Sequence, residues 1–143
     1  MKVVVDTHNK LRSKVARGLT KQPPAGDMME LEWDDELAFV AQRHADQCEV
    51  GHDCGDCRKV RRFKVGQNVW RGRDSNYFQP DWRYVVEDWF SEISFFPGGS
   101  DILNYRLTPG TGHFTQIAWA ETTKVGCGLI IHRGRNVDNL YTR

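Results

Sequence analysis

The spacing of apolar residues changes along the chain, and this change limits the folds available to it. Apolar side chains recur at three- and four-residue steps over residues 4–15, 35–48 and 82–93, which predicts three amphipathic helices. Towards the C-terminal end they alternate instead. This alternation predicts strands over 114–119 and 125–132, joined by a turn at 121–124. The order, helices first and a hairpin late, predicts an α+β domain with helices packed on an antiparallel sheet.

Residues that start or stop helices lie at the ends of these segments. Asp34 precedes the second segment as a candidate N-cap, and Gly18 follows the first as a natural stop. Pro97 and the two glycines after it end the third segment. The short segment 63–70 favours a strand, although Gly66 weakens it.

Length and charge exclude several classes of protein. The chain has 143 residues, which is enough for one domain with a real core, and its 20 basic and 19 acidic residues give a net charge of +1. This net charge is too small to indicate a nucleic-acid-binding protein. The basic run at 58–62 is therefore interpreted as the solvent-exposed side of a loop. No apolar stretch approaches the ~20 residues of a membrane span, and the apolar start at 1–5 is too short for a signal peptide.

Three of the four cysteines fall within ten residues, which favours disulfide chemistry in an oxidising compartment. They are Cys48, Cys54 and Cys57, and the last two form a Cys-x-x-Cys motif. No strand-to-helix context surrounds this motif and no second such motif is present, which weakens a redox or zinc interpretation, so a stapled loop is favoured. Cys127 lies between two glycines in an apolar stretch, where a buried or disulfide-bonded sulfur is expected.

Two of the five histidines are candidates for chemistry. His8 and His44 lie on helical apolar stripes and are expected to be core or boundary residues. His52 and His113 each follow a glycine at the edge of an element, where a side chain can face a cleft. Two such imidazoles could bind a divalent metal or relay protons, but their spacing alone does not bring them together. The chain contains no GxSxG, HExxH, P-loop or dinucleotide-binding motif.

Several of these stretches together resemble the CAP superfamily of cysteine-rich secretory, antigen-5 and pathogenesis-related proteins. The strongest is GHFTQIAW at 112–119, followed by VGCG at 125–128. HNKLR at 8–12, LEWDDELA at 31–38 and VGQNV at 65–69 also resemble the family, and the last of these resembles its antigen-5 branch in arthropod venom and saliva.

The resemblance implies a single CAP domain over residues 1–143, folded as a three-layer α-β-α sandwich around a central antiparallel sheet. It also implies a cleft with two histidines and two acidic residues. Carried over by position, these are His52, His113 and Glu92, with Gln67 in the place of the second acid. The two histidines are expected to bind Zn²⁺ or Cu²⁺, while Glu92 and Gln67 position a water or the ligands themselves.

Gln67 weakens the case for an enzyme. Because glutamine does not ionise, it is neither a general base nor a charged metal ligand, so a hydrolase that needs paired carboxylates is disfavoured. No catalytic residue is therefore assigned. A metal-dependent enzyme, either a copper redox enzyme or a hydrolase that uses the histidines and Glu92, remains the alternative. A scaffold with a vestigial cleft, whose surface loops bind a partner, is a third possibility.

The resemblance also implies differences at the chain ends. The family continues past Tyr141 into a strand with a partner for Cys127, and antigen-5 proteins have an N-terminal segment that supplies further cysteines. Neither is in this sequence, which implies a fragment, a truncated variant, or a different pairing such as Cys48 or Cys54 with Cys57.

The function expected from the resemblance is that of a secreted, non-enzymatic binding protein of venom or saliva. Its expected partner is a small hydrophobic ligand or a host extracellular protein, with no role for nucleic acid or a membrane span, and the protein is expected to be a monomer. Secretion is implied by the family alone, since the sequence shows no signal peptide.

Overall fold

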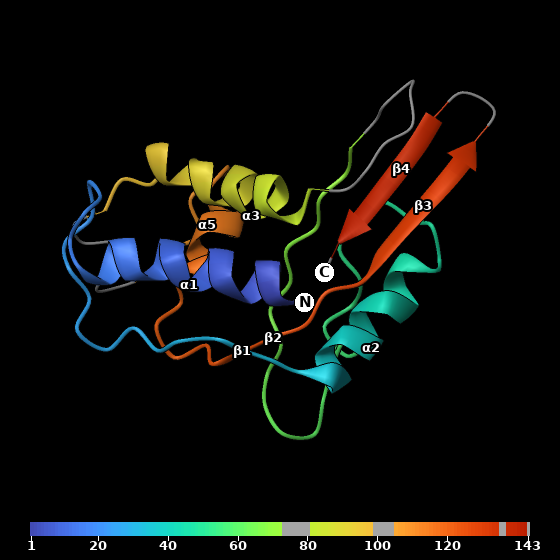
Figure 1. Cartoon of the computed structure of the whole chain (residues 1–143), viewed down its shortest axis with the longest axis horizontal. Helices are drawn as coiled ribbons and strands as arrows, with labels where there is room; N and C mark the ends of the chain where they lie inside the picture. The colour runs from blue at the N-terminus through green and yellow to red at the C-terminus, as the bar shows by residue number, and fades with distance from the viewer. Residues whose placement is uncertain (73–80, 99–104, 135–136, 143) are drawn as a thin grey trace. The chain divides into compact units, whose positions relative to one another are not determined.

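The structure is a computed structural model that describes residues 1–72, 81–98, 105–134 and 137–142. The chain divides into two compact units (Figure 1). The first unit combines Met1–Glu32 with Trp82–Thr123, and the second combines Trp33–Asp81 with Lys124–Arg143.

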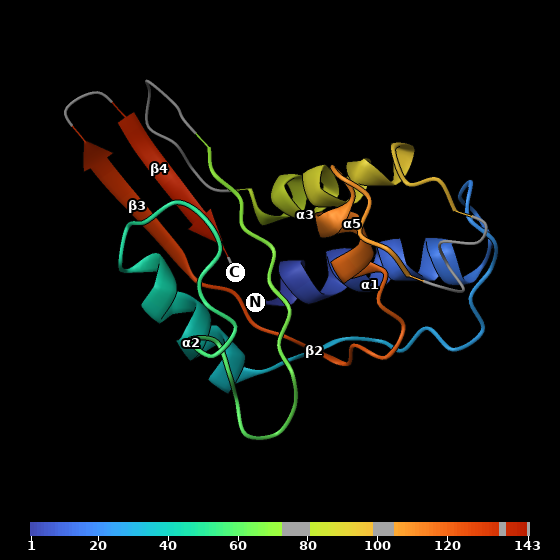
Figure 2. The ribbon, with the colours of Figure 1, turned by 180° about the vertical axis from the view of Figure 1, so that it is seen from behind.

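The first unit is helical. It contains α1 (Lys2–Ala16), α3 (Trp82–Ser91), the short 3-10 helix η1 (Glu92–Ser94) and α5 (Gly112–Ile117). Helix α1 packs on α3, and α3 packs on α5, as the views from both sides show (Figures 1 and 2). The buried apolar residues of this unit are Val4, Leu11, Val15, Leu31, Val85, Val86, Trp89, Phe114 and Ile117.

Helix α1 confirms the first predicted helix and its stop signal. After the helix ends, Gly18 adopts a φ of 65°, a left-handed conformation that glycine reaches at little cost. The N–H of Gly18 then donates to the Val15 carbonyl oxygen, and the N–H of Leu19 donates to that of Lys14. These bonds satisfy carbonyls that the helix end would otherwise leave open.

Arg12, on the buried face of α1, holds the loops of the first unit together. Only 2% of the residue is exposed, and its guanidinium donates to five backbone carbonyl oxygens, those of Met29, Ile117, Trp119, Ala120 and Thr122. Burial lowers the pKa of Arg12 to about 10, so the side chain remains charged at neutral pH. A buried cation is thus stabilised by carbonyl dipoles.

The second unit combines a helix with a β-hairpin. It contains α2 (Asp35–Ala45) and the antiparallel strands β3 (Leu129–Gly134) and β4 (Val137–Thr142), which pair from Leu129↔Thr142 to Gly134↔Val137. Helix α2 contacts both strands. Two further short strands, β1 (Glu32–Trp33) and β2 (Lys124–Val125), pair with each other.

The VGCG stretch lies directly against the backbone of α2. A Cβ atom at Gly126 would lie 2.2 Å from the Ala38 nitrogen, and one at Gly128 would lie 2.3 Å from the Gln42 nitrogen. Only glycine permits this approach. The Gln42 amide then accepts from the Leu129 N–H and donates to the Leu129 carbonyl oxygen, each at 2.9 Å, so β3 begins fixed to the helix.

Asp34 caps α2 as predicted and also pairs with an arginine. Its side chain accepts from the Leu37 N–H at 2.9 Å and from the Arg62 guanidinium at 2.8 Å. Desolvation opposes ionisation of Asp34, but these hydrogen bonds outweigh it and lower the pKa of the carboxyl group. Arg62 also pairs with Glu36.

The prediction of a strand over 114–119 was wrong, because this stretch forms α5. Phe114, Thr115 and Ile117 are buried, which is the pattern of a helix face and not of an alternating strand. A six-residue segment is too short to distinguish the apolar spacing of a helix from that of a strand. The helix is favoured by Glu92, a residue distant in sequence whose carboxylate caps the first turn of α5.

The predicted hairpin was also wrong in position. The segment 125–132 divides into β2 and β3, and β3 pairs with β4 beyond it, while 121–124 is not a hairpin turn. Segment 63–70 forms no strand element, and α2 ends at Ala45, earlier than predicted. The α+β class itself is confirmed. Within the described residues, no helix is both long and apolar enough to cross a membrane.

Candidate functional site

Glu92 organises the first predicted histidine. It follows α3 directly, and its carboxylate lies at the N-terminal end of α5. One oxygen, Oε2, accepts from the backbone N–H groups of His113 (2.8 Å) and Phe114 (3.2 Å), while Oε1 lies 2.8 Å from His113 Nδ1. A negative charge at the start of a helix is favourable, so one side chain both caps α5 and orients the imidazole.

This contact determines which His113 nitrogen carries the proton. Because a carboxylate oxygen only accepts, Nδ1 must donate, and the lone pair of the neutral ring then lies on Nε2. The ring also stacks on Trp89, with 6.0 Å between ring centroids. His113 is therefore held in one orientation by a charge, a backbone bond and an aromatic neighbour.

The second predicted histidine, His52, contacts Gln67 in the same way. His52 Nδ1 lies 2.8 Å from Gln67 Oε1, and Arg58 Nη1 lies 3.3 Å from that same oxygen. Since a guanidinium only donates, the shared amide atom must be the oxygen, and His52 Nδ1 must donate to it as well. His52 therefore also has its lone pair on Nε2.

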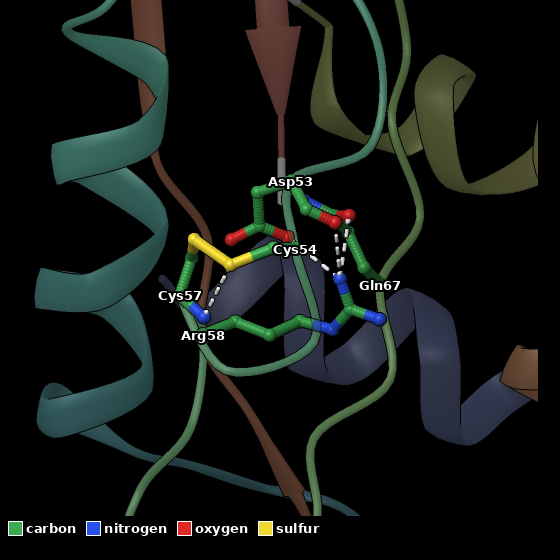
Figure 3. The surroundings of a disulfide bond; sticks show 5 residues. All are labelled: Asp53, Cys54, Cys57, Arg58 and Gln67. Carbon is green, nitrogen blue, oxygen red and sulfur yellow. Dashed lines mark hydrogen bonds and ion pairs between the residues drawn. A yellow bond between two sulfur atoms is a disulfide. The ribbon is translucent and has the colours of Figure 1, made fainter.

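Arg58 braces the loop around His52 (Figure 3). Its Nη1 contacts the Asp53 carboxylate at 2.6 Å and the Asp53 carbonyl oxygen at 3.0 Å, and its Nε donates to the Val65 carbonyl oxygen at 3.0 Å. Asp53 already neutralises the guanidinium, so the neutral oxygen of Gln67 is sufficient as a further acceptor.

The predicted site residues thus form two pairs, His113 with Glu92 in the first unit and His52 with Gln67 in the second. Arg58 was not predicted as part of the site, because nothing in the sequence separates it from the other cations of its basic run. Across the described ranges, no three His, Cys, Asp or Glu side chains form a group that could hold a metal ion.

The other two histidines examined in the sequence are structural, as predicted. His8 is buried and contacts the Val4 carbonyl oxygen at 2.9 Å, and desolvation lowers its pKa. His44 is also buried and lies 3.1 Å from the Gly51 carbonyl oxygen.

The cysteine cluster contains one disulfide, between Cys54 and Cys57, so the predicted stapled loop is confirmed. Cys48 is outside this bond, and its thiol lies 3.8 Å from the Asp46 carbonyl oxygen. Cys127 forms no disulfide with the other three cysteines, all of which are described. Although Cys127 as a whole is only half-buried, burial of its thiol raises the pKa to about 12.

Comparison with known proteins defines the class of this chain. The model of the CAP family, described as the cysteine-rich secretory protein family, matches residues 5–142. This chain therefore belongs to the CAP family, as the sequence motifs predicted.

Among named relatives, the chain is 44% identical over 147 aligned residues to "CRISP/Allergen/PR-1" of Trittame loki and 43% identical over 137 to "Venom allergen 5" of Tityus serrulatus. The alignments cover 98% and 92% of this chain but 36% and 33% of those proteins, so the chain spans about a third of their length.

Solved structures agree on the fold. Na-ASP-1 superposes with a TM-score of 0.78 at 26% identity, over 99% of this chain and 37% of that one. A structure described as NaASP2 with Zn²⁺ superposes with a TM-score of 0.72 at 27% identity, over 99% and 76%.

Proposed function

We propose that this chain is a secreted venom protein of antigen-5 type that acts by binding, and that His52 and His113 are ligands of Zn²⁺ or Cu²⁺. The observation that carries the metal proposal is the tautomer that the two imidazoles have in common. Each donates Nδ1–H to a side-chain oxygen and so has its lone pair on Nε2. Metal-binding histidines commonly have this arrangement, in which the second nitrogen donates to an oxygen.

The donor set fits these metals. Neutral imidazole nitrogen is a good ligand for zinc and copper, and Gln67 and Glu92 would act behind the ligands by fixing the rings. Two histidines leave the remaining coordination positions to water or to a bound partner. The zinc named for the related NaASP2 structure supports the proposal, because that protein is similar over nearly all of this chain.

Binding is preferred over catalysis because of the way the two acceptors are used. Gln67 carries no charge, and the carboxylate of Glu92 already accepts three hydrogen bonds, two of them from backbone N–H groups. A general base needs an oxygen that can reach a substrate proton. Glu92 is instead a positioning residue, and the proposed partner is a small hydrophobic ligand or a host extracellular protein.

Secretion into venom is supported by the relatives, which include proteins named venom allergen 5 from Tityus serrulatus, Polistes dominula and Vespula flavopilosa. The disulfide is consistent with this, since such bonds persist in oxidising compartments.

Calorimetric titration with ZnCl₂ and CuCl₂ tests the metal site. We expect the wild type to bind the ion, and we expect His52→Ala and His113→Ala each to weaken binding at least about tenfold, since each removes a ligand. Asp56→Asn, an exposed position in the loop of His52, is the matched control and should bind as the wild type does. No binding by the wild type, or binding that either histidine variant retains in full, would contradict the proposal.

A further inference from the structure

The Cys54–Cys57 disulfide closes a very small loop. Only two residues separate the cysteines, and the stabilisation from cross-linking falls with the size of the closed loop. The loop is already held independently by Arg58, which bonds to Asp53, Val65 and Gln67. Opening the disulfide would therefore leave these contacts in place.

Both cysteines of this bond are exposed, so a thiol in solution can approach the bond. The segment that contains them is a surface turn, with the Cys57 N–H donating to the Cys54 carbonyl oxygen at 2.9 Å. Exposure and a Cys-x-x-Cys spacing are the features of disulfides that take part in exchange, whereas structural disulfides are usually protected.

The two sulfur atoms are not equivalent. The Cys57 N–H also lies 3.0 Å from Cys54 Sγ, and Figure 3 marks this contact beside the disulfide. A backbone N–H directed at a sulfur stabilises negative charge on it, and exchange is faster when the departing sulfur is the better-stabilised thiolate. Cys54 is therefore the preferred leaving group, and Cys57 is the preferred point of attack.

We propose that Cys54–Cys57 is a thiol–disulfide exchange site whose substrates are low-molecular-weight and protein thiols. A thiolate RS⁻ attacks Cys57 Sγ and forms an R–S–S–Cys57 bond. The Cys54–Cys57 bond breaks, and its electron pair remains on Cys54 Sγ as a thiolate beside the Cys57 N–H. A second RS⁻ then attacks the sulfur of R, which releases RSSR and leaves Cys57 as a thiolate that takes a proton from water. The protein disulfide gains two electrons, and two thiols are oxidised.

The test uses the whole chain with Cys48→Ser, which removes the other exposed thiol; Cys127 is left in place because burial raises the pKa of its thiol to about 12. The oxidised protein is mixed with reduced glutathione, quenched with N-ethylmaleimide and mapped by peptide mass spectrometry. We expect glutathione on Cys57 and maleimide on Cys54, in at least about threefold excess over the reverse arrangement.

A synthetic peptide spanning residues 51–60, with its cysteines oxidised to each other, is the matched control. It contains the same two sulfurs and the Cys57 N–H, but it lacks the contacts of Arg58 with Val65 and Gln67 that hold the turn, so we expect a smaller preference for Cys57 than in the protein. A second variant pair, Cys54→Ser and Cys57→Ser, each in the Cys48→Ser background, is treated with oxidised glutathione instead. The remaining thiolate attacks one sulfur of GSSG and releases GS⁻, and the adduct should persist because no neighbouring thiolate can displace it.

Three results would overturn the proposal. Peptide mapping of the untreated protein could show that Cys54 and Cys57 are not bonded to each other. The disulfide could resist glutathione under conditions that reduce the peptide. Finally, glutathione could divide equally between the two sulfurs in the protein, which would remove the role of the Cys57 N–H.

Discussion

The two units use arginine in opposite ways. In the first unit, Arg12 is almost fully buried and its guanidinium bonds to backbone carbonyl oxygens. In the second unit, Arg62 pairs with the carboxylates of Asp34 and Glu36, and 46% of its side chain is exposed. One cation is part of a core, and the other is part of a surface.

This difference shows that a charge stabilises a fold according to what its removal leaves behind. Removing Arg62 would leave the exposed carboxylate of Glu36 to water, and buried Asp34 would keep the Leu37 N–H as a donor. Removing Arg12 would leave several carbonyl oxygens in the interior without donors. Surface ion pairs contribute about 0–1 kcal/mol, whereas each orphaned buried polar group costs about 1–3 kcal/mol.

Arg12→Met should reduce the free energy of unfolding by at least about 3 kcal/mol, because the carbonyl oxygens lose their donors while the side-chain volume is kept. Urea denaturation followed by tryptophan fluorescence measures the change. Arg12→Lys retains the positive charge but lacks the planar guanidinium with its several N–H donors. It should therefore lose less of the free energy of unfolding than Arg12→Met, but should remain less stable than the wild type. A loss below about 1 kcal/mol would mean that water replaces the guanidinium, and the contrast with Arg62 would fail.

Glu92→Gln should cost about 2 kcal/mol, because hydrogen bonds to a charged acceptor are the stronger kind and an amide has only one oxygen for three donors. The reverse change at the other histidine, Gln67→Glu, should alter stability far less. If both variants were equally destabilised in urea, the anchoring role of Glu92 in α5 would be contradicted.

The acid dependence of stability should begin with the first unit. Burial lowers the pKa of His8, so the unfolded chain takes up a proton at this position before the folded chain does. The contribution of neutral His8 to the free energy of unfolding is fully present above about pH 6.5. Below that pH it is lost, by at most about 1.4 kcal/mol per pH unit. His8→Gln should flatten this limb of the stability profile measured by urea denaturation.

Asp34, in the second unit, should act at lower pH. Despite the opposing desolvation, hydrogen bonds lower the pKa of its carboxyl group, so its contribution is present at neutral pH and is lost as the pH falls through the acidic range below the ordinary carboxyl value. In urea denaturation at different pH values, Asp34→Asn should remove the loss of stability in that acidic range. The loss of stability that His8 causes below about pH 6.5 should be unchanged.

Arg62→Met should have the smallest effect, less than about 1 kcal/mol, because the guanidinium is half exposed and screened by salt, and Asp34 keeps its bond from the Leu37 N–H. The same urea experiment at low and high salt measures it, and the difference from wild type should shrink at high salt. A loss as large as that of Arg12→Met would show that exposure does not separate the two arginines.

The sequence predicted what depends on neighbours along the chain. The buried stripe of α1, the stop at Gly18 and the cap at Asp34 all follow from residues within a few positions of one another. Helix α5 could not be predicted in this way, because Glu92, which caps it, lies about twenty positions earlier. Its six residues alone fit a strand as well.

The same distinction between local and distant residues applies to the candidate site. The four positions came from resemblance to the family, and their pairing as His113 with Glu92 and His52 with Gln67 became visible only in the fold. Arg58 could not be predicted as the residue that fixes Gln67, because its role depends on where the segments around Asp53 and Val65 are brought together.

Arg12 also has a consequence for the order in which the protein can form during synthesis. The acceptors that Arg12 shares with the segment from Ile117 to Thr122 are made 105 to 110 residues after Arg12 itself. At about 5–20 residues per second, α1 waits roughly 5–20 s on the ribosome before those carbonyl oxygens exist. During that interval the helix exposes an apolar stripe and a cation with an incomplete set of acceptors, so α1 is made long before it can reach its final state.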